Sequence, residues 1–254
     1  MSERTPSEPC ASRRLAGYGV HALTAGGVLL ALLAMLETAS AAPDPRWVFL
    51  WLGLAILVDA ADGPLARRVD IARSAPAIDG RTIDDIVDYL TFTFIPLVLV
   101  LRMGWAAGPY WLAFGAVGFA LVASLFGFAH RMAKDEARGF FRGFPSYWNV
   151  LTYYFGLWVA YYGTAGRVAV TLSLLLFAVL TVLPIRFIYL NLAPPPWKAP
   201  LMLGALAWGL LLLAMLPWYP HPNDPDGAIR ETVMWVSLSY PALYALVSIR
   251  VDRR

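Results

Sequence analysis

The chain has 254 residues, of which 59% are hydrophobic and only 15% are charged. This composition lies outside the range of ordinary soluble domains and indicates a membrane protein. The formal net charge of +3 gives no reason to expect a nucleic-acid partner, and the single cysteine, Cys10, excludes an internal disulfide and a four-cysteine metal site.

Eight apolar runs follow one another along the chain, each close to the roughly 20 residues that a helix needs to cross a bilayer. Runs of this length are helical, because a helix satisfies its own backbone hydrogen bonds in lipid. We therefore expect an all-α fold, a polytopic membrane bundle of about eight helices that forms one domain over residues 1–254. The runs are residues 16–37, 47–66, 84–103, 109–130, 147–163, 168–190, 200–217 and 231–249.

The basic residues predict the orientation of this bundle. With the N-terminus inside, only Arg46, Arg102, Arg167 and Arg230 lie outside, and the other 16 of the 20 Lys and Arg lie inside. Both termini are thus predicted to be cytoplasmic. Residues 12–42 also resemble a cleavable signal peptide, but their apolar stretch is longer than usual and its removal would disturb the charge alternation.

Acidic residues concentrate between the second and third runs, where residues 59–88 contain seven aspartates. Asp59 and Asp62 are three apart and share a helix face, and Asp84 and Asp88 are four apart and do the same. The two pairs lie at the end of one run and the start of the next. Because the connection between the runs is short, we expect the four carboxylates to converge.

Four carboxylates in one place need positive charge, since like charges and burial both disfavour ionisation. Two divalent cations would supply it, and an all-oxygen site suits Mg²⁺ or Mn²⁺. Such sites commonly bind phosphate. The other three acids, Asp70, Asp79 and Asp85, fall off the two faces and are predicted to be solvated and paired with neighbouring arginines.

Small and basic residues accompany the acids. Gly63 and Gly80 carry no side chain, so a ligand can approach their backbone closely. Ala66 is small and lies on the same helix face as Asp59, and Arg67 can offer a planar fork to phosphate.

These letters form a motif. Asp59-Ala-Ala-Asp62-Gly63-Pro-Leu-Ala66-Arg67, followed by Gly80-Arg-Thr-Ile-Asp84-Asp-Ile-Val-Asp88, resembles the signature D-x2-D-G-x2-A-R…G-x3-D-x3-D of the CDP-alcohol phosphatidyltransferases, with every fixed letter present. The spacer between Arg67 and Gly80 is longer than in most of that family. It resembles the bacterial branch that makes phosphatidylcholine, as do VHALTAGG (20–27) and FRGFPSYWN (141–149).

The resemblance implies a reaction and a set of roles. A phosphatidyl group passes from CDP-diacylglycerol to choline, giving phosphatidylcholine and CMP, by direct attack of the choline hydroxyl. Asp59, Asp62 and Asp84 hold two divalent ions, Mn²⁺ or Mg²⁺, with Asp88 beside them as metal ligand and general base. The CDP site comprises Gly63, Ala66, Arg67, Gly80 and Thr24. The resemblance also implies a homodimer.

Choline carries a fixed positive charge, which aromatic rings recognise. Tyr147, Trp148 and Asn149 in the 141–149 stretch, together with Tyr89 beside Asp88, are the predicted choline-binding residues. Each of the aromatic residues also suits an interfacial belt or a packing role. In the same way Thr24 suits a helix contact, and His21 suits helix packing better than ligand binding.

Three alternatives stay open. The acceptor could be serine, inositol or a glycerol phosphate, although anionic acceptors call for more basic residues. A divalent-cation transporter also buries acids among helices, but its sites tend to lie near the membrane midplane in matching halves. The third alternative is a lipid-binding protein without catalysis.

Overall fold

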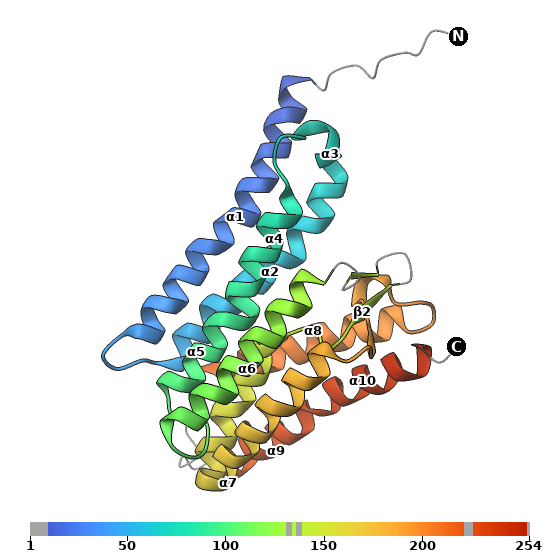
Figure 1. Ribbon diagram of the computed structural model, residues 1–254. Helices are drawn as coiled ribbons and strands as arrows, with labels where there is room; N and C mark the ends of the chain where they lie inside the picture. Colours follow the sequence, from blue (N-terminus) through green and yellow to red (C-terminus); the bar gives the residue numbers. More distant parts are fainter. Residues whose placement is uncertain (1–9, 131–133, 136–138, 221–225, 253–254) are drawn as a thin grey trace, which may run out of the picture.

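The protein is described here by a computed structural model that covers residues 10–130, 134–135, 139–220 and 226–252. Figure 1 shows an almost entirely helical chain, as expected for an all-α membrane protein. The helices are α1 (Ala11–Ala39), α2 (Pro45–Val69), α3 (Ile71–Ser74), α4 (Gly80–Asp88), the π-helix η1 (Tyr89–Phe94), α5 (Ile95–Arg102), α6 (Tyr110–Ala129), α7 (Trp148–Val182), the 3-10 helix η2 (Leu190–Leu192), α8 (Lys198–Met215), the 3-10 helix η3 (Leu216–Trp218), α9 (Gly227–Ser237) and α10 (Ser239–Asp252).

Six helices in the described part of the chain are long and apolar enough to cross a membrane. They are Ala11–Ala39, Pro45–Val69, Tyr110–Ala129, Trp148–Val182, Lys198–Trp218 and Gly227–Asp252. Nearly all of the fifth predicted run and most of the sixth fall in Trp148–Val182, and the third run is not among the six. The polytopic helical membrane fold is therefore confirmed, while the count of eight spans stays a prediction.

The third predicted run is helical but changes pitch along its length. The α-helix α4 continues directly into the π-helix Tyr89–Phe94 and then into α5, because the residues at both junctions, Tyr89 and Ile95, keep right-handed helical backbone angles. None of the three pieces is long enough by itself to cross a bilayer. Together, however, they form one helical path from Gly80 to Arg102. π-Helical turns inside α-helices are frequent at functional sites, and this one follows immediately after Asp88.

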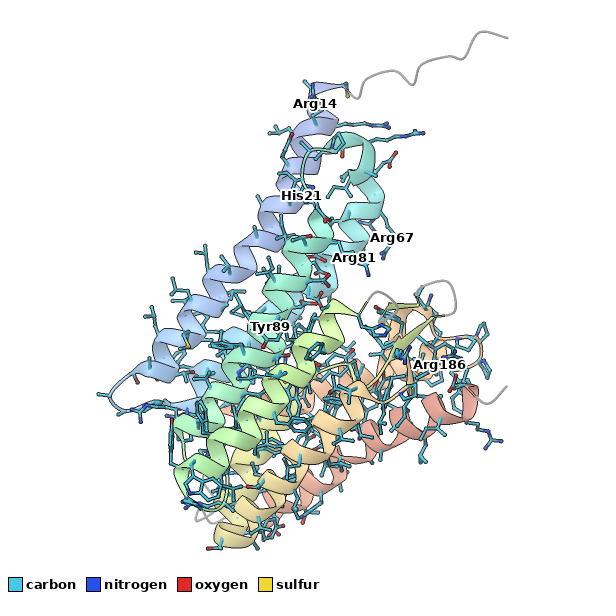
Figure 2. All side chains as sticks on the ribbon, viewed as in Figure 1. Arg14, His21, Arg67, Arg81, Tyr89 and Arg186 are labelled. Carbon is cyan, nitrogen blue, oxygen red and sulfur yellow. The ribbon has the colours of Figure 1, made fainter. Side chains whose placement is uncertain are left out.

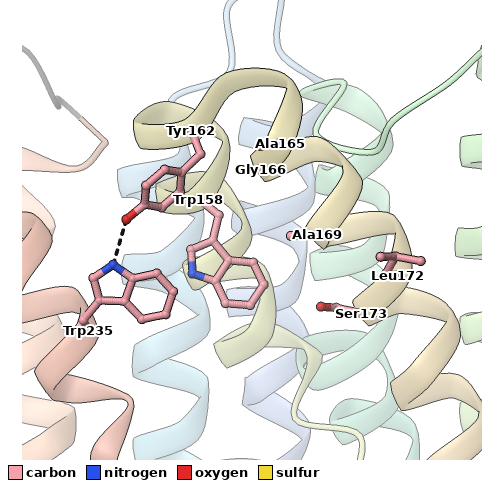
Figure 3. Close-up of a pocket in the computed structure, with 8 residues that line it drawn as sticks. All are labelled: Trp158, Tyr162, Ala165, Gly166, Ala169, Leu172, Ser173 and Trp235. Atoms are coloured by element: carbon pink, nitrogen blue, oxygen red, sulfur yellow. Dashed lines mark hydrogen bonds between the residues drawn. The ribbon is translucent and has the colours of Figure 1, made fainter.

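Helix α7 has two arms that join at Gly163, whose angles of φ 54° and ψ −119° are not helical. A side chain on Gly166 would collide with the backbone of Trp158, at 2.1 Å from its carbonyl oxygen, so the two arms touch just after the turn. Figure 3 shows this turn. The break predicted between residues 163 and 168 thus coincides with the change of direction in the backbone.

An apolar hollow of about 600 Å³ lies beside the same turn, between α7 and α9. Trp158 and Trp235 line it, and the Trp235 indole nitrogen donates a hydrogen bond of 2.7 Å to the Tyr162 hydroxyl. The described residues that line this hollow include no acidic residue, and they lie around the turn in the middle of α7.

A small antiparallel sheet, which the sequence did not predict, joins α6, α7 and α8. Its strands are β1 (Lys134–Asp135), β2 (Phe140–Arg142) and β3 (Arg186–Ile188), in the order β1-β2-β3. Phe140 is opposite Ile188, and Arg142 is opposite Arg186. Strands of two or three residues carry too little periodicity to be seen beside long apolar runs.

The core lies where α5, α6 and α7 meet, with small residues on α6 that let the helices approach closely. Beside this core, α1 packs along α2 and α4, as Figure 1 shows. The three helices α1, α2 and α4 therefore bring together the motif residues 59–88 and the first apolar run.

Candidate active site

Three of the four in-register aspartates come together as expected. One carboxylate oxygen from each of Asp59, Asp84 and Asp88 lies within 4.8 Å of the other two, and each residue is partly buried. Asp59 comes from α2, and Asp84 and Asp88 come from successive turns of α4. An all-oxygen group of this size suits a hard divalent cation such as Mg²⁺ or Mn²⁺.

The N-terminus of α4 is fixed by its cap. The Asp79 carboxylate accepts hydrogen bonds from the backbone N–H of Arg81 and Thr82, at 3.1 and 3.4 Å, and from the Thr82 hydroxyl at 2.7 Å. The hydroxyl bond first, and the backbone bonds with it, lower the pKa of Asp79 below its usual value. The cap defines where α4 begins and thus sets the height of Asp84 and Asp88 beside α2.

Asp62 has a different environment from the other three acids. Within the described residues it is not part of the group of Asp59, Asp84 and Asp88. It is buried, at 8% exposed, and its Oδ2 accepts a 2.7 Å hydrogen bond from the Thr24 hydroxyl on α1. Thr24 thus reaches the acidic site through Asp62.

Gly63 and Arg67 form an open corner of the site on α2. A Cβ atom on Gly63 would meet only the Arg67 guanidinium, whose Nη1 would lie 3.5 Å away. The Arg67 guanidinium therefore reaches back one helical turn and lies over Gly63, the residue next to Asp62. Ala66 is partly buried on the same helix. A phosphate group can approach this corner without meeting a fixed side chain.

Gly80 differs from the expectation. A Cβ atom there would lie 2.7 Å from Cε1 and 2.9 Å from Nδ1 of His21 on α1. The space left by the missing side chain is therefore filled by the imidazole rather than left for a ligand. Figure 2 labels His21 on α1.

Two of the three acids predicted to be solvated pair with neighbouring arginines as expected, and the third caps a helix. Asp70 lies 3.6 Å from the Arg73 guanidinium and Asp85 lies 3.9 Å from that of Arg81, while Asp79 caps α4. These acids are held by their own local partners and lie outside the group of three.

Tyr147 is the predicted choline-binding residue whose phenol is influenced by the clustered acids. It directly precedes α7, and its ring contacts Phe92 with a centroid separation of 6.0 Å. Burial raises the pKa of the Tyr147 phenol, and the carboxylates of Asp59 and Asp88 raise it further. The hydroxyl therefore lies in the field of two of the three clustered acids.

The other three predicted choline-binding residues have different surroundings. Trp148 is fully buried and donates a 2.7 Å hydrogen bond to the Ser124 hydroxyl, and Tyr89 donates one of 3.2 Å to the Leu121 carbonyl. Both bonds go to α6, so Trp148 and Tyr89 tie helices together. Asn149 is buried, and its side-chain oxygen accepts from the Val150 N–H.

The chain is similar to several curated bacterial proteins. It is 36% identical to a phosphatidylcholine synthase of Rhizobium meliloti over 211 residues, which cover 81% of each protein. It is 33% identical to one of Bradyrhizobium diazoefficiens, over 91% of this chain and 83% of that protein. A phosphatidylcholine synthase of Pseudomonas aeruginosa is 44% identical over 138 residues, only 54% of this chain and 56% of that protein. No protein-family model matches the chain.

Proposed function

Because the chain belongs to the phosphatidylcholine synthase family, we propose that it transfers the phosphatidyl group of CDP-diacylglycerol to choline, releasing CMP. The observation that carries this proposal is the group of Asp59, Asp84 and Asp88, with carboxylate oxygens within 4.8 Å of one another. Its oxygen ligands suit the divalent cations that commonly bridge carboxylates and phosphates.

The proposed reaction is a direct displacement at phosphorus. The choline oxygen forms a new bond to the phosphorus that bears the diacylglycerol, the bond from that phosphorus to the oxygen shared with CMP breaks, and CMP leaves with the electron pair. Asp88 accepts the proton of the choline hydroxyl as general base. Divalent ions, when bound by Asp59, Asp84 and Asp88, supply charge that stabilises the leaving phosphate.

The residues around the acids have separate tasks in this proposal. Arg67 beside Gly63 contacts a phosphate of CDP-diacylglycerol, next to the small side chain of Ala66. Thr24 orients the Asp62 carboxylate, which the family pattern assigns to the metals. The lipid chains of the substrate stay in the bilayer.

Choline recognition is assigned to Tyr147 as the primary candidate. A quaternary ammonium group offers no hydrogen-bond donor, so aromatic faces and carboxylates are the groups that attract it. The polar groups of Trp148 and Tyr89 are already bonded to α6, whereas Asp59 and Asp88 act on the Tyr147 phenol, and this supports Tyr147 over the other two.

The topology proposed for this reaction has eight spans, both termini in the cytoplasm and the acids at the cytoplasmic side of the inner membrane. The distribution of Lys and Arg supports it, as do the two arms of α7 and the unbroken helical path from Gly80 to Arg102. A homodimer remains a prediction from family resemblance.

The test is release of CMP by the purified protein in detergent with CDP-diacylglycerol, Mn²⁺ and one alcohol at a time. We expect release with choline, and none when a chelator replaces Mn²⁺. Release with serine, inositol or glycerol phosphate but not with choline contradicts the choline assignment. No release with any alcohol, combined with Mn²⁺ uptake into protein-containing liposomes, contradicts the transferase itself.

A further inference from the structure

His21 is a buried polar residue that the proposed reaction leaves without a task. Its side chain is 5% exposed, and its Nε2 atom has no hydrogen-bond partner among the residues that the structure describes. Buried polar atoms in proteins almost always have a partner, and one that has none needs an explanation. In a substrate-binding protein, the partner can come from the substrate.

The imidazole lies at a defined height in the site. One helical turn further along α1, Thr24 donates to Asp62, and one turn further along α4 from Gly80, Asp84 joins the clustered acids. His21 contacts Gly80 itself. The ring therefore lies one turn beyond the acids, on the side where α4 begins.

This position also changes the role expected of Gly80. The glycine was predicted to expose its backbone to CDP, but the His21 ring fills the space above it. The missing side chain at Gly80 thus admits the imidazole, and its Nε2 atom is a polar group at this height that lacks a partner among the described residues.

Given the function proposed above, on which this inference rests, we propose that His21 Nε2 forms a hydrogen bond to an oxygen atom of the nucleotide half of CDP-diacylglycerol. The other parts of the substrates do not fit the imidazole. Acyl chains have no hydrogen-bonding groups, and the choline hydroxyl must lie at Asp88 to react. The nucleotide carries ribose hydroxyls and phosphate oxygens, both of which accept a hydrogen bond from an imidazole N–H.

The test compares variants that keep the packing but change the nitrogen. His21→Phe keeps a flat ring against Gly80 without any donor, and His21→Gln places an amide nitrogen near the position of Nε2. We expect His21→Phe to bind CDP in the presence of Mn²⁺ about tenfold more weakly or worse and to raise the KM for CDP-diacylglycerol. The KM for choline stays unchanged, and His21→Gln recovers most of the affinity.

Binding is measured by titrating CDP into the purified protein without choline or lipid substrate, so its outcome does not depend on turnover. Wild-type affinity for CDP in His21→Phe overturns the proposal even if choline-dependent CMP release is found. Loss of CDP affinity in that variant supports it even if choline is not the acceptor. If His21→Phe does not fold, His21→Asn, whose amide reaches only the Nδ1 position, is expected to show the same loss.

The same titration with inorganic pyrophosphate and with CMP identifies which oxygen of the nucleotide accepts the hydrogen bond. A loss of affinity shared by CDP and pyrophosphate assigns the hydrogen bond to a phosphate oxygen. A loss confined to CDP and CMP assigns it to the nucleoside. An equal and undiminished affinity for all three ligands contradicts both assignments.

Discussion

Neutralising one of the three clustered acids should make the metal-free protein more stable and the metal-bound protein less so. The carboxylate oxygens of Asp59, Asp84 and Asp88 lie within 4.8 Å of one another. Two unit charges at this separation repel by about 1 kcal/mol at the dielectric constant of water and by about 3–4 kcal/mol at an effective constant of 20. Asp84→Asn removes the repulsion of Asp84 from both neighbours.

The sign reverses when a divalent cation is present. Wild-type protein at a Mn²⁺ concentration of about 100 times the dissociation constant gains about 2.7 kcal/mol of stability. The variant lacks one charged ligand and gains less at the same concentration. The two unfolding temperatures should therefore exchange their order as Mn²⁺ is added.

The assay is thermal unfolding in detergent, first with a chelator and then over a series of Mn²⁺ concentrations. Asp85→Asn is the matched control, because Asp85 is adjacent in sequence but pairs with Arg81 at 3.9 Å and lies outside the group of three. It should respond to Mn²⁺ as the wild type does. An Asp84→Asn protein with the full Mn²⁺ response, or with a lower unfolding temperature than wild type in chelator, refutes the reasoning.

Three further outcomes are expected. Thr24→Val removes the buried 2.7 Å hydrogen bond to the Asp62 carboxylate and should lower the free energy of unfolding by about 1.5–3 kcal/mol, whereas Thr24→Ser should keep it; denaturant unfolding of both variants measures this. Asp88→Asn should lower kcat for choline-dependent CMP release by about 100-fold or more, because the general base is lost, with a smaller change in the KM for CDP-diacylglycerol. Asp79→Ala should speed amide hydrogen exchange at Thr82 near neutral pH. Hydrogen bonds lower the pKa of Asp79 in the folded protein. The cap therefore acts fully above the unfolded pKa of about 3.9 and is lost as the pH falls through the lower folded value. The difference in exchange rate between variant and wild type should persist down to about pH 4 and vanish only below it.

The sequence predicted the clustered acids because their arrangement depends on local spacing. Asp84 and Asp88 are one turn apart on a single helix, and the short connection to α2 brings Asp59 beside them. The environment of Asp62 was not predictable in this way. Its partner Thr24 lies 38 residues earlier, and no periodicity reports which helices pack together.

The residues around the acids show the same limit. A glycine in a motif indicates that something comes close to the backbone, but not whether it is a ligand or a side chain. At Gly63 it is the flexible guanidinium of Arg67, and at Gly80 it is the ring of His21. Similarly, the residues around Tyr147 and Trp148 suggested aromatic recognition of choline. Only the structure shows that the Trp148 indole is bonded to Ser124, whereas Asp59 and Asp88 act on the Tyr147 phenol.

The change from α-helix to π-helix after Asp88 could also not be predicted from the sequence pattern. The π-helix Tyr89–Phe94 contains three aromatic residues, two threonines and a leucine, and such a run fits an α-helix equally well. The turn at Gly163 was better indicated, because Gly and small polar residues interrupt the apolar runs there.

The contacts of α1 have a consequence for how the protein is made. Helix α1 precedes α2 and α4 in the chain, so its imidazole and hydroxyl acquire their neighbours only after those helices have been synthesised. A shortened gene that starts beyond Ala42, or a processing step at that point, would deliver a chain without the α1 side chains that contact Gly80 and Asp62. A purification tag is therefore better attached in front of α1 than fused to a chain from which α1 has been removed.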